Sequence, residues 1–146
     1  MLDHMELARR FIGLKELPGH DVNHPLIMAM LTLDAEWPSS DEIAWCSGYI
    51  GFVCWLAGLP RTRSLMARSW LAMGTPIDNL DLAKEGDLVI LNRGGSADPT
   101  EPGPGHIGFY LSHDDTFIHI LGGNQSNTVS ESAQPKLNLL GIRRLT

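Results

Sequence analysis

The chain changes character about halfway along its length, and this change limits the folds open to it. Helix-like segments fill the first half, whereas short strand-like segments separated by turn residues fill the second. Helices and strands that are segregated in this way, instead of alternating, are typical of α+β domains. We therefore expect N-terminal helices packed on a mainly antiparallel β-sheet.

Helix signals occur four times in the first half of the chain. Asn23 is placed as an N-cap with Pro25 in the first turn after it, and Ser64 as a cap of the fourth helix. Gly58 and Gly74 are expected to end the third and fourth helices. The expected helices cover residues 3–14, about 24–33, a segment ending at 57 with Cys46 near its front, and 64–73.

Strand signals occur five times in the second half, separated by turns rich in glycine, proline and aspartate. The expected strands cover residues 87–91, 106–111, 116–121, 127–130 and 139–143. The segment 96–105, rich in glycine and proline, is expected to be a loop that leads into the second strand. No repeat or interdomain linker interrupts the chain, and its 146 residues fit one domain, 1–146, with one core.

Charge and hydropathy narrow the classes of partner. The net charge is −6, and the largest basic groupings are the pairs Arg61/Arg63 and Arg143/Arg144, which are too small for a nucleic-acid groove. The longest apolar run, 43–59, is too short and too often interrupted by glycine to cross a membrane. We expect no nucleic-acid partner, no membrane insertion and a monomer.

The N-terminus lacks the basic-then-apolar order of a signal peptide, so we expect synthesis in the cytoplasm. The two cysteines, Cys46 and Cys54, lie eight residues apart. On one helix their Cα atoms would be about 12 Å apart, too far for a disulfide. Both are therefore expected to be free thiols, and Cys54, between Val53 and Trp55, is expected to be a core residue.

Cys46 is the candidate nucleophile. A cysteine at the front of a helix, a histidine on a later strand and a polar residue on the strand after it follow the order of papain-like thiol hydrolases. Amide groups at a helix N-terminus would lower the thiol pKa. One local signal opposes this placement: Ser39 and Glu42 form a potential capping box, which would put Cys46 in the second turn of the helix. A buried, inert cysteine is the plain alternative.

His106 is the preferred base among six histidines, and His119, inside another strand, is its competitor. Strand alternation places His106, Gly108 and Tyr110 on one face and Ile107, Phe109 and Leu111 on the core face.

Counting back through the turn at 113–115 places Asn124 within three positions of the residue opposite His106. A bulge at Gly122-Gly123 would aim Asn124 at the imidazole, and Gln125 would then point to the other face. The sequence contains no metal-binding motif, so we expect no metal and no other cofactor.

Taken together, these motifs resemble those of a family of small phage and bacterial peptidoglycan hydrolases. These belong to the papain-like cell-wall peptidases, near the NlpC-type and CHAP (cysteine, histidine-dependent amidohydrolase/peptidase) groups. The resemblance covers nearly the whole chain in the right order. It is carried by the segments 15–19 (KELPG), 42–47 (EIAWCS), 67–71 (ARSWL), 86–89 (GDLV), 105–110 (GHIGFY), 121–125 (LGGNQ) and 141–144 (GIRR).

The resemblance implies a papain-like, NlpC/CHAP-type fold and an endolysin-like enzyme that cleaves an amide bond in the stem or cross-link peptide of bacterial peptidoglycan. It implies Cys46 as the nucleophile, His106 as base and then acid, and Asn124 as the orienting residue. It departs from CHAP relatives at Gly122, where they often carry a glutamate. The protein would act on the cell wall after release, injection or export by another system.

The loop 96–105, Trp45 and Trp70 are expected to wall the cleft, with simple packing in the fold as the alternative for each. The candidate substrate-binding residues are Trp45, Trp70, Gln125 and Glu42. Two other functions fit the same pattern. One is an acyltransferase, in which an amine or hydroxyl intercepts the thioester in place of water. The other is a catalytically inactive module that binds the wall or builds a virion.

Overall fold

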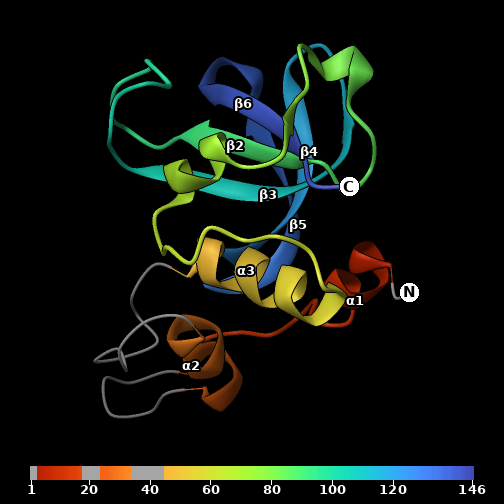
Figure 1. Ribbon diagram of the computed structural model, residues 1–146, viewed down its shortest axis with the longest axis vertical. Coiled ribbons are helices and arrows are strands. Elements are labelled where there is room, and N and C mark those ends of the chain that lie inside the picture. Colours follow the sequence, from red (N-terminus) through yellow and green to blue (C-terminus); the bar gives the residue numbers. More distant parts are fainter. Residues whose placement is uncertain (1–2, 18–23, 34–44) are drawn as a thin grey trace.

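The computed structural model describes residues 3–17, 24–33 and 45–146 (Figure 1). Its helices precede its strands along the chain, and the strands form one six-stranded sheet in the order β1-β6-β2-β3-β4-β5. Every neighbouring pair is antiparallel. The predicted α+β class with a mainly antiparallel sheet is confirmed.

Three α-helices occur in the described part of the chain: α1 (His4–Arg9), α2 (Pro25–Thr32) and α3 (Cys46–Ala57). The side chain of Asp3 caps α1 by accepting from the Met5 N–H, and His24 caps α2 by accepting from the Leu26 N–H. Asn23, the predicted cap of α2, lies outside the described residues. Gly58 ends α3 in the left-handed conformation (φ 72°), as predicted.

The predicted fourth helix is a shorter 3₁₀ helix, η1 (Ala67–Ala72). The hydroxyl of Ser64 accepts from the Met66 N–H just before it. Two further short 3₁₀ segments follow, η2 (Leu80–Leu82) and η3 (Lys136–Asn138).

All five predicted strands are present, each with somewhat different bounds, together with a two-residue strand that was not predicted. The strands are β1 (Thr75–Pro76), β2 (Leu88–Asn92), β3 (Gly105–His113), β4 (Phe117–Gln125), β5 (Thr128–Pro135) and β6 (Leu139–Arg144). The unpredicted strand is β1, which pairs with β6 through Thr75 and Arg144. Two residues are too few to show the alternation from which a strand is predicted.

The main core lies between the sheet and α3, which Figure 1 shows between the sheet and α2. Tyr49 and Val53 of α3 join Ile107 and Phe109 of β3 and Leu121 of β4 in one apolar cluster. Tyr110 belongs to a second cluster, with Ile118 and Ile120. The predicted alternation along β3, with Ile107 and Phe109 facing the core, is thus confirmed.

None of the helices in the described ranges is both long enough and apolar enough to span a membrane.

Candidate active site

Cys46 is the first residue of α3, and Trp45 is its N-cap. The structure therefore places the cysteine in the first helical turn, not in the second turn that a capping box from Ser39 to Glu42 would give. Both residues of that box lie outside the described part of the chain. The helix start is fixed by Ser47, whose hydroxyl donates to the Ser64 carbonyl (2.7 Å) and accepts from the Trp70 indole N–H (2.8 Å).

The thiol of Cys46 is buried, with 3% of the residue exposed. Burial raises its pKa, and the backbone N–H groups of Ile107 and Ser47 and the charge of Arg93 act in the opposite direction. Placement at a helix N-terminus was expected to lower this pKa, but desolvation is the larger effect. The hydrogen bond with the Ile107 N–H places the thiol beside β3. Ile107 is the residue that follows His106 in this strand.

His106 lies in β3 and is also buried, with 6% exposed. Its Nε2 atom lies 2.9 Å from Oε1 of Gln125. Because a carbonyl oxygen only accepts, Nε2 carries the proton and Nδ1 has the free lone pair. Nδ1 is buried and makes no hydrogen bond within the described residues. Burial lowers the pKa of His106, the hydrogen bond that Nε2–H donates to Gln125 raises it and Arg93 lowers it, with a net decrease.

A chain of hydrogen bonds orients the Gln125 amide. Its Nε2 donates to the Ser130 carbonyl, and its Oε1 also accepts from the Ser132 hydroxyl at 2.8 Å. Ser132 in turn accepts from the amide of Gln134 at 3.0 Å. Only one orientation of the Gln125 amide satisfies these partners, and it points the oxygen at the imidazole.

The bulge expected near Gly122 is present, but it delivers a different residue from the one predicted. Gly122 pairs with Ser130 and Gln125 pairs with Thr128, so β4 carries one extra residue between these pairs. Asn124 lies between these pairs and accommodates the extra residue by adopting the left-handed conformation, with φ 56°. A shift of one residue exchanges the faces of a strand. Gln125 consequently turns toward His106, contrary to the expectation that it would face away.

The other predicted residues lie elsewhere. The competitor His119 pairs with Asp114 (Nε2 to Oδ2, 3.2 Å) and is not among the hydrogen-bond partners of the Gln125 side chain. Trp45 and Trp70 are 0% and 1% exposed, so they pack in the core and offer no surface to a substrate. The Trp45 indole N–H donates to Glu16 at 2.7 Å. Glu42 lies outside the described residues.

A groove of about 390 Å³ opens beside His106. Its walls come from the end of β2, the β4–β5 turn, β5 and η3, and Cys46 does not line it. Apart from the imidazole, Arg93 is the one ionisable side chain among the lining residues, which are Asn92, Arg93, Gly94, His106, Asn124, Gln125, Ser126, Ser132, Gln134 and Asn138.

Arg68 organises the loop between β2 and β3, a role that the sequence analysis missed. Its guanidinium is buried and donates to the backbone carbonyls of Ser96, Asp98, Glu101 and Pro104 and to Oδ1 of Asn92. The predicted loop over 96–105 therefore exists but is anchored from within. The available signal was a charged residue in the mostly apolar segment 67–72.

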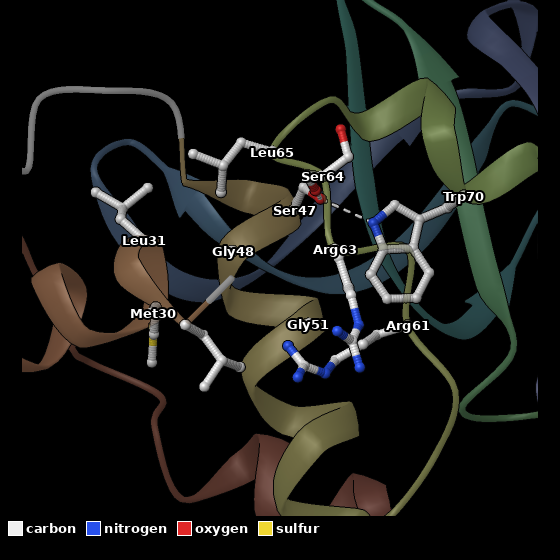
Figure 2. A pocket seen from close by; sticks show the side chains of 11 residues that line it. Met30, Leu31, Ser47, Gly48, Gly51, Arg61, Arg63, Ser64, Leu65 and Trp70 are labelled. Carbon is white, nitrogen blue, oxygen red and sulfur yellow. Dashed lines mark hydrogen bonds between the residues drawn. The ribbon is translucent and has the colours of Figure 1, made fainter. Parts of the chain in front are cut away.

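A separate, mainly apolar cavity lies between α2, α3 and the segment before η1 (Figure 2). It is lined by Met30, Gly48, Leu65 and Trp70, and Figure 2 shows the Ser47–Trp70 hydrogen bond at its wall. None of the described residues that line it is a cysteine or histidine, so its lining differs from that of the groove. Within the described ranges, no three His, Cys, Asp or Glu side chains gather closely enough to hold a metal ion.

Comparison with known proteins identifies the fold. No protein-family model and no curated protein matches the chain. Solved structures do match, among them NlpC1 from Trichomonas vaginalis (16% identity, TM-score 0.57) and a lipoprotein-like protein of the NLP/P60 family from Staphylococcus aureus (21% identity, TM-score 0.55). Each match covers 97% of this chain but only 42% and 40% of the respective solved chains. The chain has the fold of NlpC/P60 proteins.

Proposed function

We propose that this protein is a cysteine peptidase or amidase that hydrolyses an amide bond in the stem or cross-link peptide of bacterial peptidoglycan. The observation that carries the proposal is the His106 imidazole, which Gln125 holds through Nε2 while Nδ1 stays without a hydrogen bond in the described structure. An imidazole held in this way is prepared to act as a base. Cys46, at the start of α3, is the proposed nucleophile, and its thiol interacts with the backbone N–H of Ile107, the residue after His106.

The first half of the reaction is acylation. Nδ1 of His106 takes the proton from the Cys46 thiol as the sulfur attacks the carbonyl carbon of the scissile amide. The backbone N–H of Cys46 is at a helix N-terminus and supplies a donor to the oxyanion. His106 then gives its proton to the departing amine, and a thioester remains.

The second half is hydrolysis. A water molecule loses a proton to Nδ1 and attacks the thioester carbonyl. The C–S bond then breaks, the carboxylic acid leaves and Nδ1 returns the proton to the sulfur, which restores the thiol. Gln125 orients the imidazole in both halves by accepting from Nε2–H. It takes the role that the sequence analysis gave to Asn124.

The pKa shifts define the resting state. Burial raises the pKa of Cys46 and lowers that of His106, so both groups are neutral at pH 7. Proton transfer therefore accompanies the attack on substrate instead of preceding it as a stable ion pair. A carbonyl that enters the site needs no ion pair to be disrupted.

The proposed substrate class rests on the fold and on the segments that resemble wall hydrolases. One solved neighbour is named as an NLP/P60 lipoprotein-like protein and another as NlpC1. We propose that the enzyme acts at the cell wall in an endolysin-like role. Residues 1–146 would then form one catalytic domain.

The test is a digest of purified sacculi, with free amino groups and reducing ends assayed in parallel. Amines are expected to rise without reducing ends, because a thiolate cleaves acyl bonds, whereas glycan cleavage needs a pair of carboxyl groups. Cys46→Ala is expected to abolish the release and Cys54→Ala to preserve it. A rise in reducing ends alone, or full activity of Cys46→Ala, would contradict the proposal.

Mass spectrometry of the released muropeptides identifies the bond and separates hydrolysis from acyl transfer. Hydrolysis gives a free carboxylic acid. Transfer gives an adduct of an added amine instead. A folded protein that releases neither product and does not consume the substrate would be the inactive module.

A further inference from the structure

The groove beside His106 is polar but almost uncharged. Amides and hydroxyls supply most of its lining, and none of the described residues that line it is a carboxylate. Arg93 is the one permanent cation there, in a protein whose net charge is −6. An isolated cation among neutral hydrogen-bonding groups suits a ligand that carries an anion on a peptide-like body.

Among the residues that the structure describes, Arg93 has no anionic partner. Arg9 is paired with Glu85 (2.7 Å) and Arg144 with Asp87 (2.7 Å). The guanidinium of Arg93, by contrast, forms no hydrogen bond or ion pair within the described ranges, and the residue is exposed. Its donors are therefore available to a ligand.

The turn that carries Arg93 is held in place. Oδ1 of Asn92 accepts from the Gly95 N–H and from Arg68, each at 2.9 Å, and its Nδ2 donates to the Gly95 carbonyl at 2.9 Å. The Arg93 N–H donates to the Pro104 carbonyl at 3.4 Å. A cation on a pre-organised turn binds a ligand without the entropic cost of ordering a loop.

Arg93 also lines the same groove as His106, the proposed base. Its charge lowers the pKa of Cys46 and of His106, the two residues proposed to carry the chemistry. An anion bound by Arg93 would thus lie near the bond being cleaved.

We infer that Arg93 binds a carboxylate of the peptide substrate adjacent to the scissile amide, so that the enzyme selects acidic stem peptides over the same peptides with amidated carboxylates. This inference rests on the proposed function. It assigns a specificity residue to the same site.

The kinetic test uses two soluble stem peptides that differ only in whether their carboxylates are free or converted to carboxamides. The wild-type enzyme is expected to favour the free acid by about 10- to 100-fold in kcat/KM, which is the range for a hydrogen-bonded charge pair. Arg93→Gln should remove this preference by slowing only the acidic peptide. Arg93→Lys should keep part of it, because lysine retains the charge but not the planar fork.

Arg10→Gln is the matched control, since Arg10 is an exposed arginine at the end of α1. This variant loses the same charge at a position distant in sequence from Arg93. It should change kcat/KM for each of the two peptides by less than about twofold. An Arg93→Gln enzyme that slows equally on both peptides would show that Arg93 acts only through the thiol and imidazole, and would overturn the inference.

A binding measurement separates this inference from the proposed reaction. Calorimetry on Cys46→Ala protein is expected to show tighter binding of the acidic peptide, and Cys46→Ala/Arg93→Gln is expected to lose the difference. Equal binding of both peptides, or binding of neither, overturns the role of Arg93. Arg93-dependent binding by Cys46→Ala together with no cleavage by wild type overturns the proposed hydrolysis and leaves the carboxylate site standing.

Discussion

His106 and Gln125, nineteen residues apart in sequence, meet through a 2.9 Å contact between Nε2 and Oε1. The contact joins β3 to the end of β4 and depends on the bulge at Asn124. It sets the tautomer of the imidazole, and the proposed chemistry requires that tautomer.

Gln125→Ala should lower kcat by about 10- to 100-fold, because a hydrogen bond to a charged group contributes about 1.5–3 kcal/mol and the imidazole becomes charged during the reaction. Asn124→Gly is the matched comparison. Glycine accepts the φ of 56° found at Asn124, so this change removes a side chain without strain. It should leave kcat near the wild-type value. The reverse order of effects, measured in folded variants, would return the orienting role to Asn124.

The pH profile should show an acidic limb with a midpoint below 6.5, because the net pKa shift of His106 is downward and only the neutral imidazole accepts the thiol proton. The hydrogen bond from His106 to the Gln125 oxygen raises this pKa, so Gln125→Ala should move the limb to lower pH. Arg93 lowers the pKa, so Arg93→Gln should move the limb to higher pH. Initial rates from pH 4 to 8 at low substrate concentration measure both shifts, and shifts of the same sign would contradict the assignment of His106 as base.

Iodoacetamide should alkylate Cys46 before Cys54, and chelators should not inhibit. Burial raises the pKa of Cys54 to about 12 without any opposing contact, whereas backbone N–H groups and Arg93 favour the Cys46 thiolate. Because Cys46 is itself buried, alkylation should be slow at pH 7 and accelerate as pH rises. Peptide mapping of a time course records the order. Modification of Cys54 first would show that Cys46 is not uncovered to small molecules.

Two glycine substitutions should have opposite effects on the free energy of unfolding. A Cβ at Gly123 would lie 2.8 Å from both Trp45 and Tyr49 at the start of α3, so Gly123→Ala should destabilise the protein by about 1–3 kcal/mol. At Gly51, within α3, the nearest atom is 3.9 Å away, so Gly51→Ala should stabilise by up to about 1 kcal/mol through helix propensity. Denaturant titrations compare the two, and equal effects would show that α3 does not pack on β4 at Gly123 as described.

Local patterns in the sequence were sufficient to predict the order of elements. Gly58 ended α3, and alternation along β3 separated Phe109 from Tyr110. These features depend on near neighbours in the chain. The two-residue strand β1 (Thr75–Pro76) was not predicted, because it is defined only by its pairing with β6.

The details of the site depend on distant contacts, which explains where prediction stopped. Whether Asn124 or Gln125 meets His106 is decided by a single extra residue in β4, and Gly122-Gly123 indicated a bulge without showing which side chain it would aim. The sign of the Cys46 pKa shift depends on burial against β3, not on the helix start alone. The indole of Trp45 was expected at a surface and is instead enclosed, with its N–H bound to Glu16.

Arg68 holds the β2–β3 loop almost entirely through main-chain carbonyls, at Ser96, Asp98, Glu101 and Pro104. Every amino acid supplies such a carbonyl, so the anchoring does not depend on which side chains the loop displays. Positions 97–101 are exposed and can be exchanged while the turn that presents Arg93 stays in place. The loop can therefore diversify in evolution, or be randomised in a library, while the geometry of the proposed catalytic groups is conserved.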